Sequence, residues 1–294
     1  MTYTISQTKL LEAFTKYRYL IPPHMMALGI QKNASALANK VISPLAKAEK
    51  PLIRHNKLIK SNPSKGKLHY IYCLTDEGAR TIADYLKCDP QSIVYPKKDM
   101  RFASDYFHRC DYISFYIEFE KYLNQTDEQG ADLNNYHIEE SHHYFDRRRL
   151  YVNINNRKYN PTTLLYKVER DPLAIEPDGL FVLSNFEKQK LFSVEIHRSP
   201  NTKDILEQIN QHLYAMSEAS MSKRFKTKEQ PQYLLSVSSK ESTLKNILAR
   251  VHVLPAICHF REYLLFSHIE KVKEDFENAW VDFRGEKVNI FNKL

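Results

Sequence analysis

Glycine is scarce in this chain, which has 6 glycines among 294 residues. No GxxxxGK[ST] loop occurs, so an ATPase or helicase with a phosphate-binding loop is not expected. Four cysteines are present, but none belongs to a CxxC pair and no histidine cluster completes a set of zinc ligands. The sequence therefore predicts reduced thiols in place of disulfides or a structural zinc site.

Long apolar runs are also missing. No segment approaches the roughly 20 apolar residues that a membrane helix needs, and the first residues lack the basic-then-apolar order of a signal peptide. We therefore expect a cytoplasmic protein with no membrane partner. The hydrophobic content of 43% is nevertheless enough for packed cores, and a chain of this length is expected to form two domains.

Basic residues are concentrated in the first third of the chain. Residues 1–100 contain 16 Lys and Arg against 7 Asp and Glu, whereas residues 101–294 contain 27 against 28. A DNA backbone binds such a surface because each neutralised phosphate releases condensed counterions. The distribution therefore favours double-stranded DNA as a partner, and a basic surface that only aids solubility is the alternative.

Helix and hairpin signals follow one another through this basic third. Apolar spacing predicts a helix over 5–18 with Ser6 as its N-cap, a short helix from Pro22 to Gly29, and a third over 33–47 with a stripe of Leu37, Val41 and Leu45. Segments 52–59 and 68–74 predict a β-hairpin with a basic tip, and a further helix follows from Thr75 to Leu86.

This order of elements is that of a winged helix-turn-helix domain, which we expect over residues 1–90. In that fold the third helix enters the major groove and the hairpin tip contacts phosphate or the minor groove. A small α+β domain that binds a protein is the alternative. The residues predicted to contact DNA are Lys32, Ser35, Asn39, Lys40, Lys47, Lys57, Lys60, Lys65 and Lys67.

The remainder of the chain predicts an α/β (α+β) domain over residues 103–294, after a linker at 91–102. A long amphipathic helix is expected over 103–123. Strands and helices then intermix. Strands are expected near 136–145, 164–169, 173–183, 191–197, 232–237 and 262–268, and helices over 203–219, 240–250 and 270–279.

Two apolar runs that flank a polar turn predict a β-hairpin over residues 174–198. With the turn centred between residues 186 and 187, facing residues have numbers that sum to 373, so Asp178 opposes Glu195. Side chains alternate along a strand, so His197 shares the face of Glu195. Opposed carboxylates in an apolar hairpin repel each other, and a divalent cation relieves that repulsion. We therefore predict Asp178 and Glu195 as ligands of Mg²⁺ or Mn²⁺, unless a one-residue slip separates them.

An Asp on one strand and Glu-x-Lys on the next resembles the PD-(D/E)xK nuclease superfamily. Here Asp178 and Glu195-Ile196-His197 occupy the pattern, with His197 where Lys is usual. The winged helix, a helix with His108 and Asp111, and a following helix with Gln211 and Tyr214 extend the likeness. Taken together, the chain resembles the replication-relaxation family, which includes MobC-type relaxases of mobilisable plasmids.

The resemblance implies a PD-(D/E)xK restriction-endonuclease-like fold for the second domain. It also implies a metal-dependent endonuclease that nicks one DNA strand at a plasmid origin during mobilisation or conjugation, with a mobilisation or coupling protein as a further partner. Asp178, Glu195 and His197 are then the catalytic residues. The histidine either acts as a base in place of the fixed charge of lysine or marks an inactive site.

Several alternatives stay open at this point. A third acidic ligand is sought among Asp111, Glu118, Glu139 and Glu140, and the nucleophile is either metal-bound water or a tyrosine among Tyr17, Tyr19 and Tyr214. Adjacent His142 and His143 are expected to point to opposite faces of a strand. Residues 147–149 are three arginines, for which we expect either a contact with phosphate or a solvated turn. The rival functions are a non-catalytic DNA-binding regulator of replication or transcription on a degenerate nuclease fold, and a restriction- or repair-type nuclease.

Overall fold

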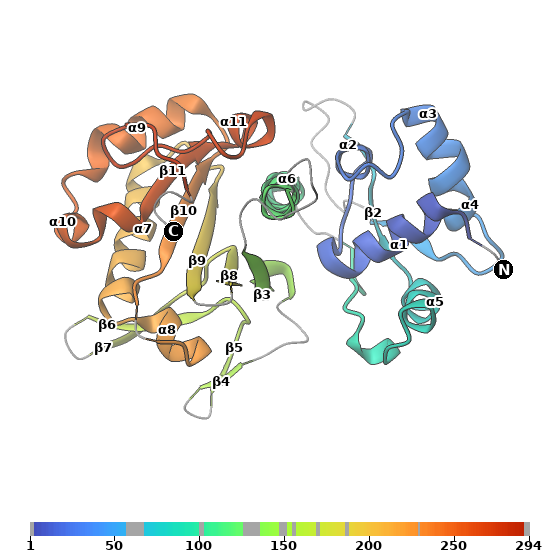
Figure 1. Ribbon diagram of the computed structural model, residues 1–294, viewed down its shortest axis with the longest axis horizontal. Helices are drawn as coiled ribbons and strands as arrows, with labels where there is room; N and C mark the ends of the chain where they lie inside the picture. The colour runs from blue at the N-terminus through green and yellow to red at the C-terminus, as the bar shows by residue number, and fades with distance from the viewer. Residues whose placement is uncertain are drawn as a thin grey trace. The chain divides into compact units, whose positions relative to one another are not determined.

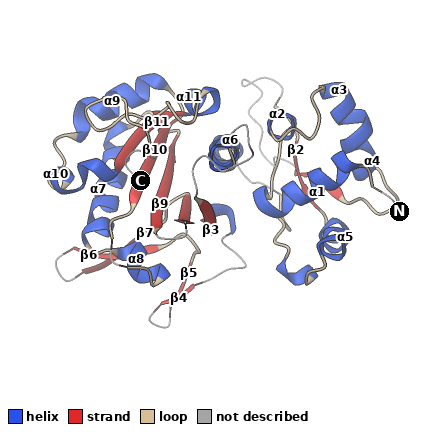
Figure 2. Cartoon of the chain, in the orientation of Figure 1, coloured by secondary structure: helices blue, strands red, loops and turns tan. Residues whose placement is uncertain are grey.

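The computed structural model describes residues 3–56, 68–99, 103–125, 136–146, 152–154, 157–168, 171–185, 188–228 and 230–290. The chain forms two compact units, residues 1–117 and 118–294, each of which is described by itself (Figure 1). It is a mixed α/β protein, as the sequence predicts (Figure 2). The finer division into residues 1–90, 91–102 and 103–294 stays a prediction.

The first unit combines short helices with one hairpin. Its strands β1 (Ile53–Asn56) and β2 (Ile71–Leu74) pair antiparallel, which confirms the predicted hairpin. Its helical segments are α1 (Ile5–Tyr17), α2 (Pro22–Ala27), α3 (Ala34–Ala36), η1 (Leu37–Ile42), α4 (Ser43–Ala46), α5 (Asp76–Leu86) and η3 (Pro90–Ser92), and α6 (Ala103–Leu123) runs from this unit into the next.

The start of α1 differs from the sequence prediction. Thr4, and not Ser6, is the N-cap: its Oγ1 accepts the backbone N–H of Gln7 at 3.3 Å, and Gln7 Oε1 accepts the N–H of Thr4 at 3.0 Å. This reciprocal pair is a capping box, which satisfies two backbone donors at once and fixes where the helix begins. Gly29 follows α2 with a φ of 67°, as predicted for the residue that ends that helix.

The predicted third helix is continuous from α3 through η1 to α4, but η1 is a π-helix. The N–H of Ser43 donates to the carbonyl of Ala38, five residues earlier. Pro44 has no N–H with which to satisfy the carbonyl four residues before it, that of Lys40. Gln7 Nε2 of α1 donates to this carbonyl at 3.1 Å. The predicted apolar stripe of this helix is buried, at Leu37, Val41 and Leu45.

A close approach fixes α5 against the segment that leads into β1. A Cβ atom added to Gly78 would lie 1.9 Å from the carbonyl oxygen of Leu52. Thr75 precedes the helix, and its Oγ1 accepts the N–H of Gly78 at 3.0 Å as an N-cap. Only glycine therefore permits this contact between the helix and the buried chain beneath it.

The second unit is built on a five-stranded sheet with the strand order β11-β10-β9-β8-β3. Strands β9, β10 and β11 are parallel, whereas β8 pairs antiparallel with β9 and with β3. The five strands are β3 (His137–His143), β8 (Gly179–Ser184), β9 (Gln189–His197), β10 (Tyr233–Ser238) and β11 (Leu264–His268).

Smaller elements surround this sheet. They are η4 (Tyr144–Asp146), the pair β4 (Val152–Ile154) and β5 (Arg157–Tyr159), the pair β6 (Leu164–Val168) and β7 (Asp171–Ile175), and the helical segments α7 (Thr202–Ser217), α8 (Ser220–Phe225), α9 (Glu241–Val251), α10 (Ile257–Phe260), η5 (Arg261–Tyr263) and α11 (Ile269–Glu274). The single strand predicted over 173–183 is wrong, because β7 ends before Pro177 and β8 begins after it. Proline cannot donate a ladder hydrogen bond and interrupts the strand there.

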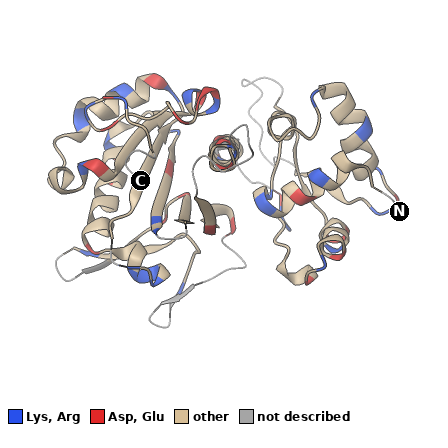
Figure 3. Cartoon of the chain, in the orientation of Figure 1, with Lys and Arg blue, Asp and Glu red and all other residues tan. Residues whose placement is uncertain are grey.

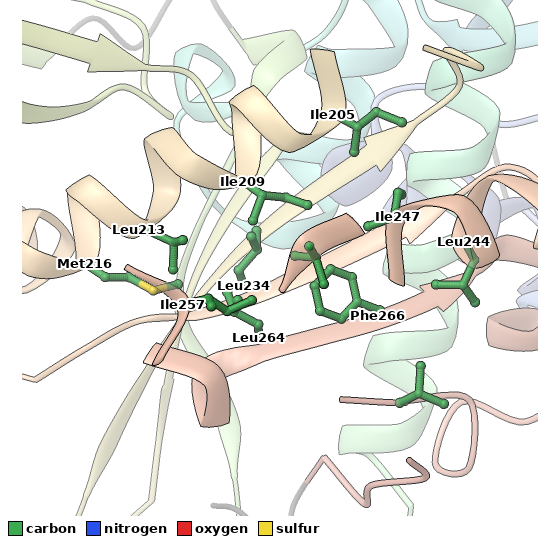
Figure 4. Close-up of a cluster of buried hydrophobic side chains, with 12 residues drawn as sticks. Ile205, Ile209, Leu213, Met216, Leu234, Leu244, Ile247, Ile257, Leu264 and Phe266 are labelled. Carbon is green, nitrogen blue, oxygen red and sulfur yellow. The ribbon is translucent and has the colours of Figure 1, made fainter. Parts of the chain in front are cut away.

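Helices α7 and α9 cover one face of the sheet. Apolar side chains of α7, such as Ile209 and Leu213, pack with Leu234 of β10 and Phe266 of β11 (Figure 4). The opposite face packs against Phe119, whose ring lies 5.2 Å from that of Phe181. No described helix has the length and apolar character needed to cross a membrane.

The path β9–α7–β10–α9–β11 places the carboxyl ends of three parallel strands at one edge of the sheet. Strand β8 runs antiparallel to β9, so β8 begins at that same edge. Residues at the start of β8 and at the end of β9 are therefore brought together. This edge holds the acidic residues that the sequence singled out.

Candidate active site

The hairpin of β8 and β9 has the register predicted from the sequence. Paired residues run from Gly179 opposite Val194 to Ser184 opposite Gln189, and their numbers sum to 373. The ladder stops at Gly179, so Asp178 lies one residue beyond the paired strand. Its N–H donates to the carbonyl of Val194 at 3.0 Å, and its Oδ2 accepts the N–H of Ile196 at 2.8 Å. The Asp178 carboxylate thus accepts the hydrogen bond of a backbone N–H of β9 just beyond the last paired residue of β8.

Glu195 lies near this carboxylate and is also buried, with 5% of its surface exposed against 8% for Asp178. Burial, and then the charge of Asp178, raise the pKa of Glu195 well above its usual value. Both effects disfavour the ionised carboxylate, the first through desolvation and the second through repulsion. Asp178 therefore lies close enough for its charge to act on the buried carboxyl group of Glu195.

A histidine that the sequence analysis did not select is hydrogen-bonded to Glu195. Nε2 of His212, on α7, lies 2.9 Å from Glu195 Oε1. Burial, and then the nearby His197, lower the pKa of His212 to about 3, so the imidazole is neutral near pH 7. A neutral donor orients the carboxylate but does not cancel its charge.

Further buried groups hold the imidazole of His212 in turn. Its Nδ1 lies 3.3 Å from Ser193 Oγ, and this hydroxyl accepts from Gln232 Nε2 at 3.3 Å. Ser193 and Glu195 are two residues apart on β9 and so share a face. Sequence alone offered two signals for this network. Polar side chains alternate at Ser193, Glu195 and His197 on a buried strand, and His212 lies within the apolar stripe of α7.

His197 occupies the position at which the superfamily pattern has lysine. Its side chain is buried, and its Nε2 lies 3.0 Å from Ser236 Oγ on β10. Ser236 is the strand neighbour of Glu195 in the parallel pairing. The third residue of the predicted catalytic set is therefore on the same face of the sheet as Glu195, and it contacts a hydroxyl group of the next strand.

Three of the four candidates for a third acidic ligand have other partners. Glu118 pairs with Lys121 at 2.8 Å, Glu140 with His142 at 2.7 Å, and Glu139 accepts from Gln189 at 2.8 Å. Asp111 belongs to the first unit. In the part of the chain that the structure describes, no group of three or more His, Cys, Asp or Glu side chains is arranged to hold a metal ion.

The remaining candidates are packed against neighbours. His142 stacks on Phe225, whereas His143 stacks on Phe145 and contacts Phe181 edge-on. The two histidines therefore point to opposite faces of β3, as predicted. The three candidate tyrosines also contact aromatic or cationic groups: Tyr17 with Tyr116, Tyr19 with Arg109, and Tyr214 with Tyr166. Tyr17 and Tyr19 are buried, which disfavours a nucleophilic role for either. Residues 147–149 lie outside the described residues.

The residues predicted to contact DNA fall into two groups. Lys32, Ser35, Asn39, Lys40 and Lys47 are exposed on the helix from Ala34 to Ala46 or beside it. Figure 3 shows where Lys and Arg, in blue, occur along the chain. Asn33 caps this helix by accepting the N–H of Ser35 at 2.8 Å. The other four, Lys57, Lys60, Lys65 and Lys67, lie outside the described residues.

Comparison of the chain with protein-family models, with curated proteins and with solved structures finds no match. The likeness to the replication-relaxation family therefore rests on the sequence motifs alone. What the site can do chemically has to be argued from its own residues.

Proposed function

We propose that this chain is a metal-dependent DNA endonuclease that nicks one strand of a plasmid origin, in the manner of a MobC-type relaxase. The observation that carries the proposal is the buried pair of Asp178 and Glu195 at one edge of the sheet, where the charge of one raises the pKa of the other. In this proposal the first unit is a winged helix-turn-helix and the second has a PD-(D/E)xK-like fold.

The donor chemistry of this pair suits Mg²⁺ or Mn²⁺. Hard divalent cations prefer carboxylate oxygens, and Mg²⁺ often binds through only one or two carboxylates while it keeps several waters. A cation between Asp178 and Glu195 offsets the repulsion between them. When bound, it activates water and stabilises charge on a phosphoryl group.

The protein groups around the pair have separate roles in the proposal. The hydrogen bond from Ile196 N–H holds the carboxylate of Asp178, and His212 holds that of Glu195. His197 acts as a general base: its imidazole accepts the proton of the attacking water or tyrosine hydroxyl while the new P–O bond forms and the P–O bond to the leaving sugar oxygen breaks. The exposed face of the helix from Ala34 to Ala46 binds duplex DNA in the cytoplasm, and a mobilisation or coupling protein is the expected further partner.

A nicking assay on supercoiled plasmid with Mg²⁺ or Mn²⁺ tests this function. The wild type is expected to produce open-circular DNA, and Asp178→Asn and Glu195→Gln are expected to abolish it. Glu270→Gln is the matched control, because Glu270 is an exposed acid of the same unit that pairs with Lys273. Calorimetry with Mn²⁺ should give binding heat for the wild type and the control only. Nicking that survives in Asp178→Asn would overturn the assignment.

The second candidate function is a DNA-binding regulator without catalysis. Two observations favour it: Glu195 is already hydrogen-bonded to His212, and position 197 has no fixed positive charge. It predicts salt-dependent DNA binding, no Mn²⁺ heat and no cleavage. The same assay also distinguishes a restriction- or repair-type nuclease, because double-strand breaks would give linear plasmid.

A further inference from the structure

Three aromatic rings lie together on the hairpin of β1 and β2. The ring of Tyr70 is 5.2 Å from that of His55 and 6.5 Å from that of Tyr72, measured between centroids. His55 is the strand partner of Tyr72, and Tyr70 is two residues before Tyr72, so all three belong to one face of the hairpin. We call these three residues the aromatic strip.

The aromatic strip is the exposed continuation of a buried face. Ile53 and Leu74, which pair with each other farther along the same face, are fully buried. Tyr70, in contrast, has 61% of its surface exposed, His55 is also exposed and Tyr72 is partly so. The exposed rings of Tyr70 and His55 are therefore not part of the hydrophobic core of the first unit. Aromatic rings gathered on a surface mark a binding site more often than an isolated exposed residue does.

The segment of sequence that contains the aromatic strip is basic, which favours an anionic ligand. Residues 50–74 contain no Asp or Glu. Their basic residues are Lys50, Arg54, Lys57, Lys60, Lys65 and Lys67. Arg54 forms an ion pair with Asp99 at 2.5 Å, so its charge is already balanced. The four lysines from 57 to 67 lie outside the described residues, and only their contribution to the net charge of the segment is considered. A polyanion with flat apolar faces satisfies both the charge and the rings, and nucleic acid is such a ligand.

Unpaired bases fit the aromatic strip better than a duplex does. In a duplex the base faces are stacked on one another, and the grooves present only base edges. In a single strand the faces are open, and proteins bind them on aromatic side chains while basic groups follow the backbone. We propose that His55, Tyr70 and Tyr72 form a stacking surface for the bases of single-stranded DNA. This inference rests on the proposed action on DNA and adds a second substrate form to it.

Fluorescence anisotropy with the full chain tests the proposal. The probes are a labelled oligothymidylate, a strand of the same length made of abasic sites, and a duplex. Tyr70→Ala should weaken binding of oligothymidylate by about 5- to 100-fold, which corresponds to the loss of one stacked base. Tyr70→Phe keeps the ring and should bind as the wild type does. Tyr85→Ala is the matched control, because Tyr85 lies on α5 and is exposed to 60%.

The abasic strand and the duplex distinguish base stacking from contact with the DNA backbone. The wild type should bind the abasic strand at least as weakly as Tyr70→Ala binds oligothymidylate, because the abasic strand has no base to stack on any of the three rings. Duplex binding should be unchanged by Tyr70→Ala. Equal losses on duplex and single strand would mean a backbone contact and would overturn the stacking surface. Unchanged oligothymidylate binding in Tyr70→Ala would overturn it as well, while leaving the endonuclease proposal intact.

Two further outcomes concern the ligand class. Tighter binding of an acidic peptide such as polyglutamate than of oligothymidylate, lost in Tyr70→Ala, would assign the strip to a protein partner and refute the proposal. A wild type that binds neither single strand nor duplex would refute both the stacking surface and the DNA-binding part of the proposed function. Thermal melting of each variant checks that the fold is kept.

Discussion

Glu195 Oε1 lies 2.9 Å from Nε2 of His212, so a buried carboxyl group of the central sheet is hydrogen-bonded to an imidazole that is neutral near pH 7. The bond fixes the orientation of the carboxyl group and leaves its repulsion from Asp178 in place. A site of this kind costs folding stability when no cation is bound. That cost is measurable without any activity.

The substitution Glu195→Gln should stabilise the protein more at high pH than at low pH. The raised pKa of Glu195 means that the folded state holds this proton more tightly than the unfolded state does. The stability that the protein gains from this bound proton is fully present below the ordinary pKa of 4.5, and it is lost as pH rises through the raised pKa of Glu195. Urea unfolding of both proteins at about pH 5 and about pH 8 measures the difference.

Glutamine cannot ionise, so the gap in unfolding free energy between variant and wild type should widen toward pH 8. Glu270→Gln, at an exposed acid of the same unit, is the control substitution outside the buried pair. An equal gap for Glu195→Gln at both pH values would contradict the raised pKa. Added Mn²⁺ should narrow the gap at high pH, because the ion stabilises only the wild type.

Removal of the side-chain amide of Gln7 should destabilise the first unit. Gln7 Nε2 donates to the Lys40 carbonyl, which the proline at position 44 cannot serve. Gln7→Ala should therefore cost about 0.5–1.5 kcal/mol of unfolding free energy, the net contribution of a typical hydrogen bond, because this bond is only partly buried. Gln31→Ala is the control, since its amide makes a long 3.5 Å contact at a partly exposed position. Equal urea midpoints for the two variants would show that the Gln7 bond is not needed.

Two glycine-to-alanine substitutions should differ in the stability that they cost, because the two glycines are required for different reasons. Gly78→Ala places a Cβ atom 1.9 Å from a backbone oxygen, so α5 has to move away from Leu52. We expect a loss of about 3 kcal/mol or more. Gly29→Ala meets no atom within 4 Å but keeps a positive φ of 67°, and should lose only about 1–2 kcal/mol. Thermal melting ranks the two, and a larger loss for Gly29→Ala would be inconsistent with the packing of α5.

The exposed helix of the first unit should govern the salt dependence of DNA binding. Lys40→Ala is expected to weaken duplex binding and to reduce the slope of log K against log salt by about 1, the effect of one lost phosphate contact. Lys245→Ala, at an exposed lysine of the second unit, is the control and should keep the wild-type slope. Titrations at several salt concentrations measure both slopes. A Lys40→Ala slope equal to that of the wild type would argue against phosphate contact.

Local patterns predicted much of the fold. The register of β8 and β9 followed from the position of one turn, because apolar runs on both sides leave a single symmetric pairing. The helix from Ala34 to Ala46 followed from its apolar stripe. Where local signals compete, prediction failed: Thr4 and Ser6 are both good caps, and only the side chain of Gln7 decides between them. Pro177 likewise ended a strand that its apolar neighbours would have continued.

The candidate site was only partly predictable. Asp178, Glu195 and His197 share one hairpin, so strand alternation was enough to select them. His212 of α7, Ser193 of β9 and Gln232, which precedes β10, meet only because three segments distant in the sequence pack together. No local pattern encodes such contacts. The departure of Asp178 from the ladder was also missed, because it depends on how the chain turns after Pro177.

The parallel arrangement of β9, β10 and β11 has a consequence for the order in which the chain folds. Phe192 pairs with Tyr233, and Leu234 pairs with Leu264. Each pairing can form only after the helical connection between the two strands has been made. Contacts between distant residues form slowly because closing a long loop costs entropy. The first unit has short helices and a hairpin and leaves the ribosome earlier. A nascent chain is therefore expected to acquire its basic helical unit before its acidic pair is assembled.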